Sequence, residues 1–71
     1  MKMQIEMNFD IPEWAKYYAV DENGDFCIFD EKPFIIDNIV GEGIFETKTN
    51  FMILAKNCII DNWKNSLSLI E

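Results

Sequence analysis

The sequence predicts a mainly β fold of the α+β class, a small antiparallel sheet or partly open barrel of about five strands with one short C-terminal helix. Three observations predict it: apolar and polar residues alternate over residues 2–9, an Asn-Gly turn separates two aromatic and β-branched runs, and helical spacing begins after Asp61. The chain has 71 residues, of which 49% are hydrophobic. We therefore expect one small domain spanning residues 1–71.

The N-terminal stretch carries the clearest strand pattern. Four apolar residues alternate with polar ones, which predicts one strand with one buried face: Met3, Ile5, Met7 and Phe9. This stretch lacks the basic segment and apolar block of a signal peptide, so we expect a cytoplasmic location. In that compartment Cys27 and Cys58 are expected to be reduced and buried.

A β-hairpin is predicted around Asn23 and Gly24, because both residues tolerate positive φ. A two-residue type I′ turn would place Val20 opposite Cys27. A three-residue loop with Gly24 in a bulge would instead place Val20 opposite Phe26. Both faces of this hairpin are apolar, which indicates a central position in the sheet or a face covered by a partner.

Pro33 ends the hairpin, and residues 34–43 are predicted to form an edge strand followed by a loop. Residues 43–49 and 51–60 are predicted to form a second hairpin turning near Asn50, with its apolar second strand innermost in the sheet. Beyond Asp61, apolar residues at spacings of 3, 4 and 3 predict the helix face: Ile60, Trp63, Leu67 and Ile70. Trp63 and Leu67 are expected to anchor that helix on the sheet.

The composition disfavours several classes of function. The chain has no Arg, no His, six Lys and thirteen acidic residues, for a net charge of −7. It therefore lacks the usual acid–base residue and the usual bidentate anion ligand, and an enzyme is not expected. The lysines are spaced singly, which disfavours direct nucleic-acid binding. No run of about 20 apolar residues is present that would span a membrane.

Two short motifs resemble ligand-binding loops but lack essential positions. Asp21, Asn23 and Asp25 match the start of a calcium loop, but Phe26 and Lys32 stand where that loop needs Gly and Glu. The GxG at residues 41–43 has a carboxylate at its centre, which would repel a phosphate. We interpret both as turns, and we predict no metal and no cofactor.

Two segments, PEWAKYYAVDENGDFCIFDEKPF and DNWKNSLSLIE, resemble a group of small uncharacterised proteins of tailed phages. Ten residues carry the resemblance: Trp14, Ala15, Ala19, Asp21, Gly24, Phe29, Pro33, Trp63, Ser66 and Leu67. It extends loosely over residues 12–71, and this chain departs from the group in its aliphatic FIIDNIVGEGIF stretch. The resemblance implies a phage origin but no established activity.

A short acidic chain of this type is predicted to act by binding. Our leading hypothesis is a stoichiometric inhibitor of a host antiviral defence protein, whose basic surface it occupies with carboxylates in place of nucleic-acid phosphates. The predicted acidic surface consists of five residues: Asp21, Glu22, Asp25, Asp30 and Glu31. A homodimer or higher homo-oligomer is also expected, because 71 residues bury little apolar surface alone.

Two alternative functions stay open. In the first, an oligomeric sponge sequesters a nucleotide second messenger, with Trp14 and Tyr17 stacking on the base and Lys16 holding phosphates. The absence of Arg argues against this ligand. In the second, the chain is a virion or assembly accessory protein.

Overall fold

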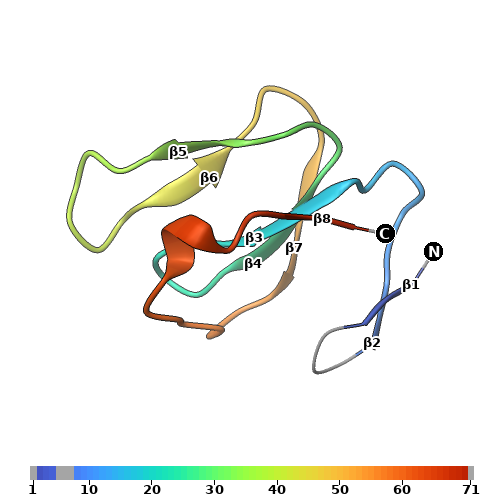
Figure 1. Ribbon diagram of the computed structural model, residues 1–71, viewed down its shortest axis with the longest axis horizontal. Coiled ribbons are helices and arrows are strands. Elements are labelled where there is room, and N and C mark those ends of the chain that lie inside the picture. Colours follow the sequence, from blue (N-terminus) through green and yellow to red (C-terminus); the bar gives the residue numbers. More distant parts are fainter. Residues whose placement is uncertain (1, 5–7, 71) are drawn as a thin grey trace.

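The computed structural model describes residues 2–4 and 8–70, which form β-strands and a single 3-10 turn. The elements in chain order are β1 (Lys2–Gln4), β2 (Asn8–Asp10), β3 (Tyr17–Val20), β4 (Phe26–Phe29), β5 (Phe34–Ile36), β6 (Ile44–Glu46), β7 (Phe51–Ala55), η1 (Trp63–Asn65) and β8 (Ser68–Leu69). Over these residues the strands form three antiparallel sheets, of orders β1-β2, β7-β4-β3-β8 and β5-β6. The mainly β prediction is confirmed, and the four-stranded sheet is open, not closed into a barrel (Figure 1).

Strands β3 and β4 form the predicted hairpin and occupy the centre of the four-stranded sheet. Val20 pairs with Phe26 and Tyr18 pairs with Ile28, which is the register of the three-residue loop. Gly24 adopts a φ of 93°, as the bulge in that loop requires. The central position predicted from the two apolar faces is therefore confirmed.

The two faces of the central hairpin belong to two separate cores. Phe26 and Ile28 pack with Ile11 and Ala15 on one face, where Tyr18 meets Phe26 edge-on at 5.7 Å between ring centroids. Alternate residues point to the opposite face, where five buried side chains pack together: Ala19, Cys27, Phe29, Phe45 and Trp63. Phe45 comes from the β5–β6 ribbon and Trp63 from η1, so these two segments cover this face of the hairpin.

The N-terminal prediction of one strand over residues 2–9 is wrong. Strands β1 and β2 instead pair with each other, with Lys2 opposite Asp10 and Met3 opposite Phe9. Alternation identifies which residues share a face, but residues of equal parity also meet across an antiparallel pair, so the pattern does not reveal that the chain folds back. The predicted apolar positions Ile5 and Met7 lie outside the described residues.

The prediction of a second hairpin, with residues 51–60 as the innermost strand of the sheet, is also wrong. Strand β6 pairs with β5 through Ile35 and Phe45, and β7 pairs with β4 at an edge of the four-stranded sheet. The decisive turn is at residues 39–42, where the Glu42 N–H donates to the Ile39 carbonyl at 3.1 Å and Gly41 has a φ of 84°. This turn closes the β5–β6 ribbon before the chain reaches β7.

The predicted C-terminal helix is only the 3-10 turn η1, followed by the short strand β8. Ser66 ends the turn, because its hydroxyl accepts a hydrogen bond from the Val20 N–H at 2.8 Å and donates to the Trp63 carbonyl at 2.6 Å. The following residues then pair with the free edge of β3, with Tyr18 opposite Ser68. Trp63 is nevertheless buried, as predicted for an anchor.

Candidate functional site

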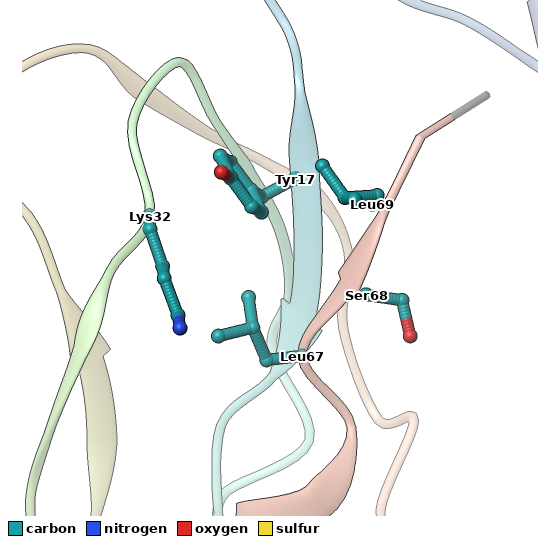
Figure 2. A pocket seen from close by; sticks show the side chains of 5 residues that line it. All are labelled: Tyr17, Lys32, Leu67, Ser68 and Leu69. Atoms are coloured by element: carbon teal, nitrogen blue, oxygen red, sulfur yellow. The ribbon is translucent and has the colours of Figure 1, made fainter.

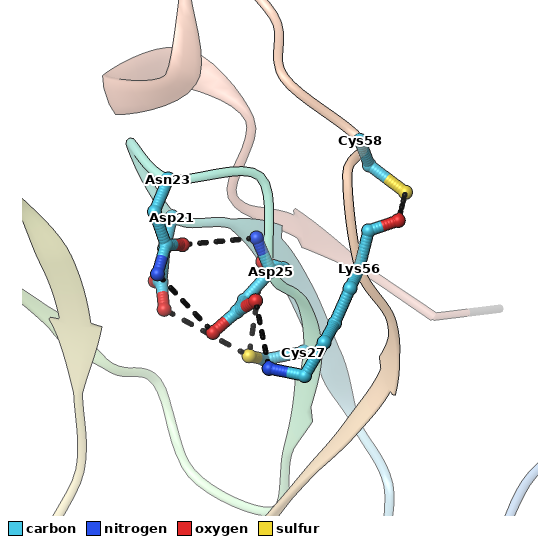
Figure 3. Close-up of polar contacts among 6 residues, drawn as sticks. All are labelled: Asp21, Asn23, Asp25, Cys27, Lys56 and Cys58. Atoms are coloured by element: carbon cyan, nitrogen blue, oxygen red, sulfur yellow. Dashed lines mark hydrogen bonds and ion pairs between the residues drawn. The ribbon is translucent and has the colours of Figure 1, made fainter.

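The β3–β4 turn positions three of the five predicted acidic residues. Its backbone is closed by the Gly24 N–H, which donates to the Asp21 carbonyl at 2.9 Å, and by the Asn23 side chain, which accepts from the Asp25 N–H at 3.0 Å. The Cys58 N–H donates to the Gly24 carbonyl at 2.8 Å, so a later segment crosses the turn. Figure 3 shows Asp25 at the centre of this polar group.

Asp21 is buried, with 7% of its surface exposed, and its carboxylate is fully engaged within the protein. It accepts a hydrogen bond from the Phe45 N–H at 2.8 Å, and the Cys27 thiol donates to it at 3.9 Å. Burial raises its pKa above the ordinary value, and the negative charges of Asp25 and Glu46 raise it further. Asp21 is therefore a structural residue and does not contribute to an acidic surface.

The Cys27 thiol lies beneath the same turn and is buried, as expected. Burial, together with the nearby carboxylates of Asp21 and Asp25, raises its pKa to about 12. The thiolate is the nucleophilic form of cysteine, so at neutral pH this group is a poor nucleophile. Cys58 is also a free thiol but is only half-buried, which departs from the prediction that both are buried.

Glu22 joins the turn to the β5–β6 ribbon. Its N–H donates to the Gly43 carbonyl, and its side chain accepts from the Gly43 N–H, both at 2.9 Å. Gly43 in turn lies directly against the indole of Trp63, where a Cβ would clash with the ring. Three segments that are distant in sequence therefore meet at this end of the molecule.

The five predicted acidic residues do not form one surface. Asp25 lies at the turn and pairs with Lys56 at 3.3 Å, whereas Asp30 and Glu31 follow β4 at its other end. Because a strand rises about 3.3 Å per residue, Asp25 and Asp30 are separated by roughly 16 Å along the strand. Asp30 accepts hydrogen bonds from the Thr49 hydroxyl and the Asn50 N–H, which lower its pKa and hold the loop before β7. Of the five, Glu31 is exposed.

Sequence reasoning missed two acidic residues that belong to the segments meeting at the turn. Glu42 precedes the Gly43 that Glu22 binds, and Asp61 lies between Cys58 and Trp63, which both contact this end of the molecule. Both side chains are exposed. We call Glu22, Asp25, Glu42 and Asp61 the turn-end carboxylates. Nothing in the sequence pattern links them, because they come from three separate segments.

The three residues predicted for nucleotide binding are not brought together. Trp14 packs against the core that contains Phe26, whereas Tyr17 packs against the opposite core, and Lys16 is exposed between them in sequence. Trp14 lies in the turn before β3, where the Ala15 N–H donates to the Pro12 carbonyl at 3.1 Å, so the alternation of faces begins only with Tyr17.

Tyr17 instead lines an open depression of about 380 Å³ together with Lys32, Leu67, Ser68 and Leu69. Figure 2 shows the Lys32 side chain running beside those of Tyr17 and Leu67. Apolar side chains, an aromatic ring and one cation are the groups that bind a flat anionic molecule. Lys32 was not among the predicted ligand-binding residues.

No family model, curated protein or solved structure matches the chain. In the part of the chain that the structure describes, no helix is long and apolar enough to cross a membrane. Within the same residues, no group of three or more His, Cys, Asp or Glu side chains is placed to hold a metal ion.

Proposed function

We propose that the protein is a non-enzymatic binding protein of phage type that inhibits a host antiviral defence protein in the host cytoplasm. It does so by occupying a basic surface of that protein with carboxylates. The observation that carries the proposal is that the three segments bearing the turn-end carboxylates contact one another, in a chain of net charge −7. Association between such surfaces is steered by charge and weakens as salt is added.

The fold joins the segments that carry the turn-end carboxylates, and it leaves part of their negative charge uncompensated. Hydrogen bonds to Gly43 and Gly24 tie the ribbon and the crossing segment to the turn, which limits the ordering that binding requires. Glu42 and Asp61 are exposed, whereas Asp25 shares its charge with Lys56. Glu42 and Asp61 are therefore the residues through which the protein would mainly contact the basic surface of its partner.

The test compares two double variants of equal charge. Glu42→Lys with Asp61→Lys alters the turn end, and Glu13→Lys with Glu31→Lys alters the opposite end, where Glu13 and Glu31 are also exposed. Each pair raises the net charge by four, so a general charge effect would be the same in both. A host protein captured from lysate at low salt is purified, and its association with each variant is measured over a range of salt concentrations.

We expect the turn-end variant to associate at least about tenfold more slowly and with a flatter salt dependence, while the opposite-end variant stays close to the original protein. Equal effects of the two variants would exclude a localised acidic site. Salt-independent binding, unchanged by either variant, would exclude the charge-based mechanism.

The sponge remains a second candidate, favoured by the depression at Tyr17 and Lys32. It predicts that a cyclic nucleotide binds in calorimetry and that Tyr17→Ala or Lys32→Ala abolishes that binding. Under this mechanism Trp14→Ala would matter only through stability, because Trp14 packs on the other face. Recovery of the protein from purified virions would instead support an accessory role in the particle.

A further inference from the structure

Strand β7 is an open, apolar edge of the four-stranded sheet. Among the described residues its paired neighbour is β4, on one side only. Three consecutive side chains remain 42–54% exposed, although the sequence there is strongly apolar: Phe51, Met52 and Ile53. An edge of this kind presents unpaired backbone N–H and C=O groups beside apolar side chains, which is a template for another strand.

The charge around this edge differs from that of the rest of the chain. Residues 47–60 contain Lys48 and Lys56 but no acidic residue, although the whole chain carries thirteen. Two copies of a protein of net charge −7 repel each other least where they meet through such a segment. Lys56 is itself paired with Asp25 at 3.3 Å, so its charge is partly compensated.

The pattern of side chains along β7 is complementary to itself. In β7, Leu54 is the extra residue of a bulge against β4, which leaves Phe51–Ile53 as the regular stretch. Antiparallel pairing about a two-fold axis at Met52 would set Phe51 opposite the partner's Ile53 on one face, twice by symmetry. Aromatic and β-branched residues are favourable cross-strand pairs, and Met52 would meet the partner's Met52 on the other face.

We propose that β7 pairs with β7 of a second copy of this chain, forming a homodimer with one continuous eight-stranded sheet. The pairing covers the three exposed side chains and satisfies the open backbone groups on both copies. A two-fold arrangement closes on itself, so the edge does not propagate into a fibre. The inference is independent of the proposed function, because other segments supply the turn-end carboxylates.

Sedimentation velocity at tens of micromolar tests the dimer. The original protein should sediment with twice the mass of its 8.4 kDa chain, and Met52→Lys should weaken the dimer at least about tenfold, because two lysines would meet on the axis. Val40→Lys is the matched control, since Val40 is 96% exposed in the β5–β6 loop and the charge change is the same. A monomeric original protein, or equal weakening by both variants, would overturn the proposal.

Disulfide cross-linking tests the register in a Cys58→Ser background. Facing side chains in an antiparallel pair have Cβ atoms about 5 Å apart, whereas diagonal ones are about 7–8 Å apart. Met52→Cys should therefore form a linked dimer under mild oxidation, and Phe51→Cys should do so much more slowly, because its facing residue is the partner's Ile53. Faster linkage at position 51, or no linkage at position 52, would contradict the two-fold axis at Met52.

Discussion

The carboxylate of Asp21 accepts a hydrogen bond from the Phe45 N–H at 2.8 Å, although the two residues are 24 positions apart. This bond fixes the first residues of β6 against the end of β3, and so places the Phe45 ring on Trp63. The bond is made by a buried acid whose pKa is raised, mainly by burial. Asp21 therefore connects two sheets while its own charge costs stability.

Two substitutions of Asp21 distinguish the effect of its hydrogen bond on stability from the effect of its buried charge. Asp21→Asn keeps an oxygen acceptor for the Phe45 N–H but removes the buried charge, so we expect stability at pH 7 to equal or exceed that of the original protein. Asp21→Ala leaves a buried N–H without its acceptor, which should cost about 1–3 kcal/mol. Urea denaturation of both variants at pH 7 measures the two effects.

The raised pKa of Asp21 also determines how the stability difference between Asp21→Asn and the original protein depends on pH. A raised pKa in the folded state means that folding favours the protonated form of Asp21. Its contribution to the free energy of unfolding is therefore complete below the ordinary pKa of 3.8 and is lost as the pH rises through the pKa of the folded state. The advantage of Asp21→Asn over the original protein should therefore grow between about pH 4 and pH 7. An advantage that shrinks over this interval would show that the folded pKa is not raised.

Trp63 is predicted to be an anchor of the fold, not a contact for a partner. Its side chain is buried, meets Phe45 edge-on at 5.8 Å and lies against Gly43. Trp63→Ala should lower the free energy of unfolding by about 3–5 kcal/mol, as for other large buried aromatic residues. Chemical denaturation followed by circular dichroism measures the loss. A folded Trp63→Ala variant of unchanged stability would show that the indole does not hold the ribbon.

The hairpin and its central position could be predicted because local residues decide them. Asn23 and Gly24 define the turn, and only its register stayed open between two alternatives. The bulge with Gly24 prevails, since Cys58 and Ile59 cross directly over the turn and the Gly24 carbonyl accepts from the Cys58 N–H. That crossing segment lies more than thirty residues away, and no local pattern reveals it.

The errors concern pairing between distant segments. An apolar run such as Phe51–Ala55 indicates a strand but not its place in the sheet, and here it occupies an edge. In the C-terminal segment, helical spacing of Trp63 and Leu67 equally suits a 3-10 turn followed by a strand on the open edge of β3. The burial of Asp21 could not be predicted for the same reason, because its hydrogen-bond partner is the backbone N–H of the distant Phe45.

Two glycines with positive φ provide a matched pair of substitutions. Gly24 has a φ of 93°, and a Cβ there would lie 2.8 Å from the Ile59 side chain. Gly41 has a φ of 84°, but a Cβ there would meet nothing within 4 Å. Gly41→Ala should therefore cost only the left-handed backbone penalty of about 1–2 kcal/mol, while Gly24→Ala should cost clearly more. Equal losses in thermal or urea unfolding would mean that the segment at Ile59 yields without cost.

The fold places the two free thiols, Cys27 and Cys58, in different environments. Cys27 is buried beside Asp21 with a pKa of about 12, whereas Cys58 is half-buried on the segment that crosses the turn. Because alkylation requires an accessible thiolate, iodoacetamide at pH 8 should label Cys58 in the folded protein and leave Cys27 unmodified. Peptide mapping by mass spectrometry after increasing exposure times measures both rates. In urea both cysteines should react at similar rates, which controls for intrinsic reactivity. Labelling of Cys27 as fast as Cys58 under native conditions would mean that the turn opens readily and that Asp21 does not hold the ribbon closed over it.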